Sequence, residues 1–308
     1  ILAWSTAAGA STFASTPAGS SAISARRPSQ RLYAFLQLYC FWRGLRGELG
    51  DRETWRRLTR GPVILMYHAL ARPGERPSRY ILSIRRFRRQ LAWLRLRKRP
   101  VLSLDEYMEY RRGHRLPPAR SVLITFDDGY AETASAAWPL VRRAGFPMAV
   151  FVVTGAAGTG NSWDRTGPLA GRPTLAWDEL RRLRSEGVTV GAHTESHPDL
   201  TQLPAAKVAG ELEGSSRQLE LELGERCLHF AYPYGERNDA VERAVASAGF
   251  ASAGSVEPGA NGPAVPATRL RRLEVWGTRS TPRFALDLWL GRHMGAPRPE
   301  AERAGRPA

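Results

Sequence analysis

From Pro62 onward, short apolar runs alternate with longer amphipathic segments, and this alternation constrains the fold more than any other feature of the sequence. Strands are predicted at 63–67, 100–103, 122–126, 148–153, 188–192, 228–232, near 250 and at 270–275. Helices are predicted at 84–97, 104–110, 131–144, 178–185, 204–223 and 239–248. Such alternation is typical of right-handed βαβ units around a parallel sheet. The number of strands favours a distorted (β/α) barrel over an open sheet.

Two adjacent acids, Asp127 and Asp128, directly follow the 122–126 run. Neighbouring carboxylates resist joint ionisation unless a cation or hydrogen-bond donors offset their charge. The pair therefore indicates a functional site, and Gly129 allows the sharp turn that lets both side chains face one cleft. The alternative is that these acids only cap the helix that follows.

Two histidines four residues apart, His193 and His197, follow the 188–192 run in the same way. Imidazole and carboxylate groups are the usual ligands of a borderline divalent metal, and two histidines with one aspartate leave positions for water and substrate. A lone histidine is more often a structural residue, but an acid pair and a histidine pair at two strand ends are improbable together by chance. In a barrel of this class the active site lies at those strand ends.

Three stretches, Thr125–Tyr130, His193–Pro198 and Phe230–Gly235, resemble in this order the first three motifs of the polysaccharide deacetylase family, carbohydrate esterase family 4. The opening run 62–68 is similar to the first strand of many members. The resemblance covers residues 62–290 and implies a distorted (β/α) barrel of the polysaccharide deacetylase type. It also implies a hydrolase that removes acetyl groups from N-acetylhexosamine units of a poly- or oligosaccharide, by attack of metal-bound water on the acetamide.

The resemblance assigns a role to each motif residue. Asp128, His193 and His197 would hold the metal, and Asp127 would be the general base. The backbone N–H of Tyr234 would stabilise the oxyanion. Zn²⁺ is the expected metal, although the same ligands accept Co²⁺, Ni²⁺ or Fe²⁺.

Two parts of the family pattern are missing. Many members carry an arginine two residues before the proline of the third motif, where it pairs with the base, but this chain has Ala231. Asp127 is therefore expected to be less firmly held in its charged form. Many members also carry a late histidine as general acid, and His293 lies too far along the chain to be a convincing counterpart. His68, after the first strand, is our candidate for the acid; the alternative is that it orients Asp127 or a nearby loop.

Aromatic residues near the predicted mouth are the guide to substrate contact. Tyr130, Trp163 and Tyr234 are of a type that stacks on pyranose rings, or that closes the core beneath a loop. Pro233 belongs to the same predicted substrate-binding set. Two other functions stay open: hydrolysis of a small non-peptide amide on the same fold, and carbohydrate binding without catalysis. The complete ligand set argues against the first, and the retained Asp127 argues against the second.

The 308-residue chain has a formal net charge of +16, which favours contact with nucleic acid or anionic membranes. However, all but two of its 45 basic residues are arginines, a bias that coding preference can produce without selection for a partner. No nucleic-acid-binding motif accompanies the charge, so we expect no specific nucleic-acid partner. Cys40 and Cys227 do not form a disulfide framework or a metal-site spacing.

We expect three regions: a low-complexity leader with a short apolar segment at 1–61, the barrel at 62–290 and a disordered tail at 291–308. Residues 31–43 are apolar and aromatic between arginines, and a helix there is too short to span a bilayer. We expect it to pack on the main domain; the alternative is peripheral contact with a membrane. A cytoplasmic or membrane-associated location is favoured over secretion.

Overall fold

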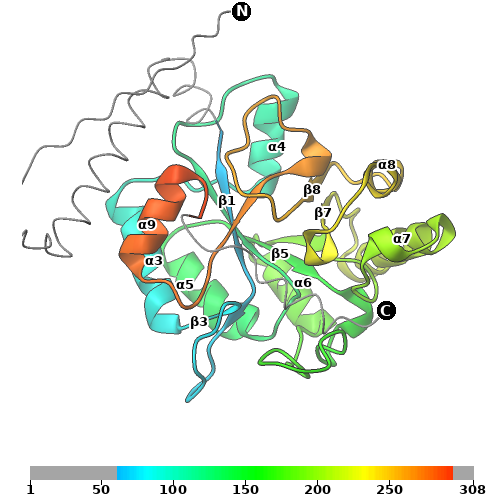
Figure 1. Cartoon of the computed structure of the whole chain (residues 1–308), viewed down its shortest axis with the longest axis horizontal. Coiled ribbons are helices and arrows are strands. Elements are labelled where there is room, and N and C mark those ends of the chain that lie inside the picture. Colours follow the sequence, from blue (N-terminus) through cyan, green and yellow to red (C-terminus); the bar gives the residue numbers. More distant parts are fainter. Residues whose placement is uncertain (1–60, 294–308) are drawn as a thin grey trace, which may run out of the picture. The chain divides into compact units, whose positions relative to one another are not determined.

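A parallel sheet rolled into a barrel forms the centre of this computed structural model, which describes residues 61–293. Figure 1 shows β1 and β5 near the middle, with helices around them. The strands of this sheet are β1 (Val63–Tyr67), β4 (Val122–Phe126), β5 (Ala149–Val152), β6 (Thr189–Ala192), β7 (His229–Ala231), β8 (Ser252–Gly254) and β9 (Arg272–Glu274). Their order is β8-β7-β6-β5-β4-β1-β9, and every pair is parallel. The predicted distorted (β/α) barrel is confirmed.

The barrel is nearly closed by a short contact between its two outer strands. Gly254 at the end of β8 and Leu270, just before β9, form a parallel bridge. The N–H of Leu270 donates to the carbonyl of Ala253, and the N–H of Ser255 donates to the carbonyl of Leu270, both at 2.8 Å. On its other side β9 pairs with β1, so β9 lies between β1 and β8.

Helices cover the outside of the barrel: α3 (Ile84–Leu96), α4 (Leu104–Arg112), α5 (Trp138–Arg143), α6 (Trp177–Ser185), α7 (Ala205–Leu223), α8 (Asp239–Ser247) and α9 (Thr281–Leu290). The side chains of Ser83 and Ser103 accept hydrogen bonds from the first turns of α3 and α4, as N-cap residues do. Among the residues that the structure describes, no helix is long and apolar enough to cross a membrane.

Two local predictions need correction, and several elements were not predicted. The predicted helix 131–144 is a π-helical turn, η1 (Thr133–Ala137), followed by the short α5; Pro139, which has no N–H to donate, lies at the start of α5. The predicted strand 100–103 is only an isolated bridge from Val101 to β4. A small sheet of β2 (Ala69–Leu70) and β3 (Ile81–Leu82), and helix α9, were not predicted.

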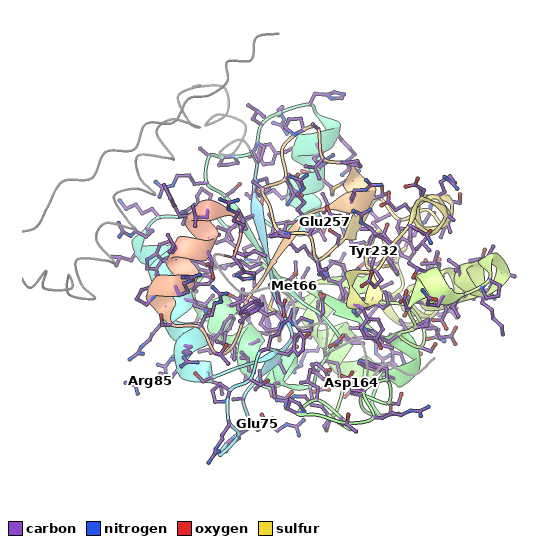
Figure 2. All side chains as sticks on the ribbon, viewed as in Figure 1. Met66, Glu75, Arg85, Asp164, Tyr232 and Glu257 are labelled. Carbon is purple, nitrogen blue, oxygen red and sulfur yellow. The ribbon has the colours of Figure 1, made fainter. Side chains whose placement is uncertain are left out.

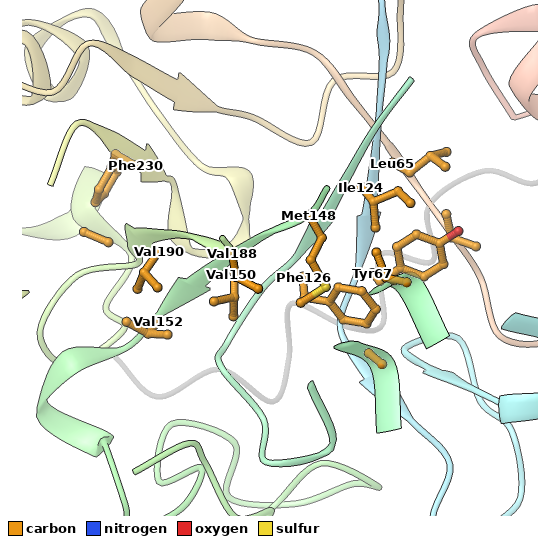
Figure 3. Close-up of a cluster of buried hydrophobic side chains, with 14 of the residues drawn as sticks. Leu65, Tyr67, Ile124, Phe126, Met148, Val150, Val152, Val188, Val190 and Phe230 are labelled. Carbon is orange, nitrogen blue, oxygen red and sulfur yellow. The ribbon is translucent and has the colours of Figure 1, made fainter. Parts of the chain in front are cut away.

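Side chains of the strands alternate between two apolar layers. Residues such as Leu65, Phe126 and Val150 pack toward the helices, as Figure 3 shows. Their neighbours along the strands, such as Ile64 and Phe151, form a second cluster inside the barrel. Because side chains fill the interior, the strand ends are the part of the barrel that is open to a substrate. The predictions for the leader, for residues 31–43 and for most of the tail lie outside the described residues.

Candidate active site

The loops after β4, β6 and β7 bring the chemically distinctive residues of the sequence to one end of the barrel. Asp127 and Asp128 follow β4, His193 and His197 follow β6, and Tyr234 follows β7. The strands are parallel and adjacent or near-adjacent, so their carboxyl ends meet at the same rim. Sequence positions more than 100 residues apart therefore share one site.

Asp128, His193 and His197 are all buried and offer three ligand atoms that converge. Asp128 Oδ1 lies 3.4 Å from Nε2 of His193 and 3.4 Å from Nε2 of His197. The two Nε2 atoms are 3.2 Å apart. Ligands at about 2.0–2.1 Å from a tetrahedral ion lie about 3.3 Å from each other. The spacing and the donor types therefore fit a divalent metal such as Zn²⁺.

Contacts around the histidines fix the direction of their rings. His193 Nδ1 lies 2.7 Å from the carbonyl oxygen of Ala231. A carbonyl only accepts, so Nδ1 carries the proton and Nε2 keeps its lone pair for a metal. The backbone N–H of His197 donates to the hydroxyl of Thr194, and the ring of Trp163 stacks on His197 with centroids 4.9 Å apart.

The electrostatic surroundings favour the forms that bind a metal. Burial alone would raise the pKa of Asp128, but the side chains of His193 and His197 beside it hold that pKa well below its ordinary value. Burial lowers the pKa of His197, although its hydrogen bond with Asp128 acts in the opposite direction. At neutral pH the ligand set therefore contains an ionised carboxylate and a neutral imidazole, as metal binding requires.

The predicted base, Asp127, forms a buried ion pair with Arg272 of β9. Nη1 of Arg272 lies 2.7 Å from Oδ1 and Nη2 lies 2.8 Å from Oδ2 of Asp127, and both side chains are almost completely buried. Nε of Arg272 also donates to the carbonyl of Ser255. Such a two-point contact fixes both charge and orientation. The expectation that Asp127 is loosely held, because Ala231 replaces an arginine, is wrong.

Arg272 is the important site residue that the sequence reasoning missed. Its sequence signal is weak, because Arg272 is one of two adjacent arginines in the predicted strand 270–275. A charged residue at a buried strand position needs a partner, because an unpaired buried charge is costly. That rule indicates that a partner exists, but not which acid it is.

His68 and Tyr234 lie beside the ligand cluster. His68 is partly exposed, and its position near Asp128 contributes to the lowered pKa of that carboxyl group. Its ring meets the ring of Tyr80 edge-on, with centroids 5.0 Å apart. Tyr234 has a left-handed backbone, with φ of 56°, and its ring lies 4.6 Å from that of His197. The roles of His68 as acid and of the Tyr234 amide stay predictions.

Tyr130 does not offer a surface to a sugar, because its side chain is 0% exposed. Its hydroxyl accepts a hydrogen bond from Asn161 Nδ2 at 2.9 Å and bonds to the carboxylate of Asp128. The prediction that Tyr130 stacks on substrate is therefore wrong. Trp163 is 7% exposed, and Pro233 is buried in the turn η4 (Pro233–Gly235). Their predicted contacts with substrate stay predictions.

A buried arginine ties together the loops at this end of the barrel. Arg172 lies 2.7 Å from Glu75 and 3.2 Å from Glu132, and it donates to the carbonyl of Leu70 at 2.6 Å. Figure 2 shows Glu75 and Asp164 on neighbouring loops on one side of the structure. These contacts join three separate loops and hold them in place at this end of the barrel.

Comparison with known proteins gives a consistent result. A profile of the family described as polysaccharide deacetylase matches residues 114–253. The poly-beta-1,6-N-acetyl-D-glucosamine N-deacetylase of Staphylococcus aureus is 27% identical over 169 residues, or 52% of this chain and 56% of that protein. The chain spans 55–65% of the length of the curated relatives it matches.

Solved structures share the fold. IcaB from Ammonifex degensii aligns with a TM-score of 0.64 and 25% identity, over 75% of this chain and 97% of that chain. The Streptococcus pyogenes deacetylase PplD, solved in complex with acetate, also aligns with a TM-score of 0.64, over 75% of this chain and 99% of that chain. Its identity to this chain is 22%, so this second likeness concerns the fold.

Proposed function

Because the chain belongs to the polysaccharide deacetylase family, we propose that it is a metal-dependent hydrolase that removes N-acetyl groups from N-acetylhexosamine units of a poly- or oligosaccharide. The observation that carries this proposal is the buried pair of Asp127 and Arg272 beside the convergent Asp128, His193 and His197. A carbohydrate-binding protein has no need for an oriented carboxylate next to three metal ligands. The named activity of the Staphylococcus aureus relative makes a β-1,6-linked N-acetylglucosamine oligomer the first substrate to test.

Asp128, His193 and His197 would hold the metal, with Zn²⁺ favoured over Co²⁺, Ni²⁺ or Fe²⁺. When bound there, a divalent cation would polarise the acetamide carbonyl and make water more acidic. The protein contributes ligands whose ionised and neutral forms, and whose spacing, already suit that cation.

The remaining residues would move protons. Asp127 would take a proton from the attacking water, and Arg272 would keep the carboxylate aimed at that position. The backbone N–H of Tyr234 would donate to the oxyanion. His68 would give a proton to the nitrogen as the C–N bond breaks, so that acetate and a free amine leave. Each step uses a group on the rim formed by the loops after β1, β4 and β7.

The alternative functions lose support. Carbohydrate binding without catalysis depended in part on the missing arginine of the third motif, and Arg272 now supplies that partner to Asp127. Hydrolysis of a small amide without a metal does not require the complete ligand set of Asp128, His193 and His197. Peripheral membrane contact through residues 31–43, and a cytoplasmic or membrane-associated location, stay proposals.

The test is acetate release from a β-1,6-linked N-acetylglucosamine oligomer by the full chain, with added Zn²⁺ or Co²⁺ and with a chelator. We expect release that depends on metal and falls about 100-fold or more in Asp127→Asn, because a positioned base contributes about 10²–10⁴-fold. Asp178→Asn is the matched control, since Asp178 is exposed on α6. A wild-type protein that binds Zn²⁺ but releases no acetate would contradict the deacetylase proposal.

A further inference from the structure

We propose that Glu211, on α7, is a positioning residue that sets the spacing of the two histidine ligands and thereby the metal affinity of the site. The inference rests on the proposed function, because it concerns the same metal site. Its basis is the loop that connects His193 to His197 and the contacts that this loop makes on both sides.

The loop is held in a conformation that an isolated peptide would not favour. Thr194 has φ of 68° and His197 has φ of 63°, and neither residue is glycine. A left-handed backbone is unfavourable for such a residue, because its Cβ atom comes close to the following carbonyl oxygen. Because His197 is itself one of these residues, relaxation of the loop would move a ligand.

Glu211 accepts hydrogen bonds from the backbone N–H groups of this loop. Its Oε2 accepts hydrogen bonds from the backbone N–H groups of Glu195 and Ser196, each at 2.9 Å. Its Oε1 accepts from the hydroxyl of Ser196 at 2.5 Å. Hydrogen bonds to an ionised carboxylate are about twice as strong as neutral ones. One side chain of α7 therefore fixes the two residues at the middle of the loop.

The turn η2 (Thr154–Ala156) donates hydrogen bonds to the backbone carbonyl groups of the same loop. The N–H of Thr154 donates to the carbonyl of Thr194 at 3.2 Å, and the N–H of Gly155 donates to the carbonyl of Glu195 at 2.9 Å. A Cβ atom on Gly155 would lie 2.7 Å from that second carbonyl oxygen, so only glycine allows this approach. The loop is thus clamped between η2 and Glu211.

Removal of the Glu211 carboxylate would leave the loop with its η2 contacts alone on this part of the backbone. The amides of Glu195 and Ser196 would lose their acceptor, and the two Nε2 atoms would no longer be fixed at 3.2 Å. Loss of residues that orient metal ligands typically costs about 10–100-fold in metal affinity. The η2 contacts remain, so the fold itself is expected to persist.

The experiment measures Zn²⁺ affinity of the full chain by competition with a chelating dye. We expect Glu211→Ala to bind Zn²⁺ about 10–100-fold more weakly than the parent. Glu211→Gln is expected to stay close to the parent, because its amide oxygen still accepts from both backbone N–H groups and its NH₂ donates to Ser196. Glu213→Ala is the control, since Glu213 is exposed on the same helix.

Hydrogen exchange of the metal-free protein gives a second readout. The amides of Glu195 and Ser196 should exchange faster in Glu211→Ala than in the parent, while the amides of other loops stay unchanged. If the alanine variant does not fold, Glu211→Asp replaces it. Aspartate keeps the charge but is one methylene shorter, so it also loses affinity.

Equal Zn²⁺ affinity in Glu211→Ala and the parent would overturn the inference, even if the metal-free variant melted at a lower temperature. That result would leave the deacetylase proposal untouched. A parent protein that binds no divalent metal would instead overturn the metal site, and this inference with it.

Discussion

Arg272 reaches across the inside of the barrel and meets both carboxylate oxygens of Asp127, at 2.7 Å and 2.8 Å. The two residues are 145 positions apart in the sequence, on strands β9 and at the end of β4, with β1 between them in the sheet. The guanidinium also lies 5.6 Å from the ring of Phe151 on β5. A long, buried side chain thus connects the last strand to the proposed base.

Arg272→Lys should separate the charge of this pair from its geometry. A lysine keeps the positive charge but cannot form the bidentate contact that a guanidinium forms with a carboxylate. We expect acetate release to fall about 10–100-fold, because small displacements of a catalytic group have effects of that size. Steady-state kinetics would measure the loss, and Zn²⁺ affinity should stay at the parent value because Arg272 does not contact the three ligands.

Arg272→Met should be more damaging to the fold, since the buried carboxylate of Asp127 would lose its counter-charge. Breaking a buried pair typically costs about 3–5 kcal/mol of unfolding free energy, which urea titration would detect. Arg271→Lys and Arg271→Met are matched controls, because Arg271 is the exposed neighbour of Arg272. Parent-like turnover in Arg272→Lys would mean that the pair is structural only.

Gly254→Ala tests the space around Arg272, because Gly254 ends the neighbouring strand β8. A Cβ atom on Gly254 would lie 2.8 Å from Nε and 2.9 Å from Cδ of Arg272, closer than side chains normally approach. The arginine would have to shift, so we expect acetate release to fall by about tenfold or more. Zn²⁺ affinity should be unchanged.

Gly210→Ala on α7 is the control for that substitution, because a Cβ atom there meets nothing within 4 Å. It should leave turnover unchanged and raise the unfolding free energy by up to about 1 kcal/mol. If Gly254→Ala also kept full turnover, Arg272 would be able to move without disturbing Asp127.

The positions of most strands and helices were predictable because their signals are local. The run Val122–Phe126 is apolar except for Thr125, and the strand has the predicted bounds. The grouping of Asp128, His193 and His197 followed from topology: parallel strands place their carboxyl ends together, and each residue lies in the loop that follows a strand. Neither inference needed knowledge of side-chain packing.

The Arg272–Asp127 pair and the orientation of the Tyr130 ring depend on side-chain packing, which the sequence pattern does not reveal. Arg272 meets Asp127 only after the barrel closes, and no local pattern pairs two residues 145 positions apart. Tyr130 follows the acid pair within a motif, but whether its ring turns inward or outward depends on the loop that carries Asn161. Pattern reasoning placed Tyr130 near the site but gave it the wrong role, and it did not single out Arg272.

Tyr130→Phe removes a hydroxyl that contacts Asp128 and accepts from Asn161. Without that hydrogen bond the Asp128 carboxylate is less firmly oriented, so we expect Zn²⁺ affinity to fall about tenfold. Tyr107→Phe is the matched control, since its buried hydroxyl donates to the carbonyl of Asn261 at 2.9 Å. Both variants should lose about 1 kcal/mol of unfolding free energy. Equal Zn²⁺ affinity in the two variants would show that Tyr130 only supports the fold.

The hydrogen bonds of Asp105 predict how stability responds to acid. Asp105, at the start of α4, lies 2.9 Å from Nε2 of the buried His229, and the hydroxyl of Thr189 donates to its other oxygen at 2.8 Å. The hydrogen bond to His229 is the main cause that lowers the pKa of Asp105 to about 2. Because this pKa is below the unfolded value of about 3.9, the contribution to stability is present above about pH 4 and is lost as the pH falls through 2.

Asp105→Asn should therefore lower the free energy of unfolding at pH 6. The difference between parent and variant should become smaller as the pH falls. The side chain of Asp105 is 49% exposed, so solvent screening limits the expected cost to about 1 kcal/mol of unfolding free energy. Urea titrations of parent and variant at pH 6, 4 and 2.5 would follow the difference, with Asp178→Asn as the control for loss of an exposed aspartate. If the difference in unfolding free energy stays constant down to pH 2.5, then packing or the neutral hydrogen bonds of residue 105, and not its charge, stabilise the contacts with Thr189 and His229.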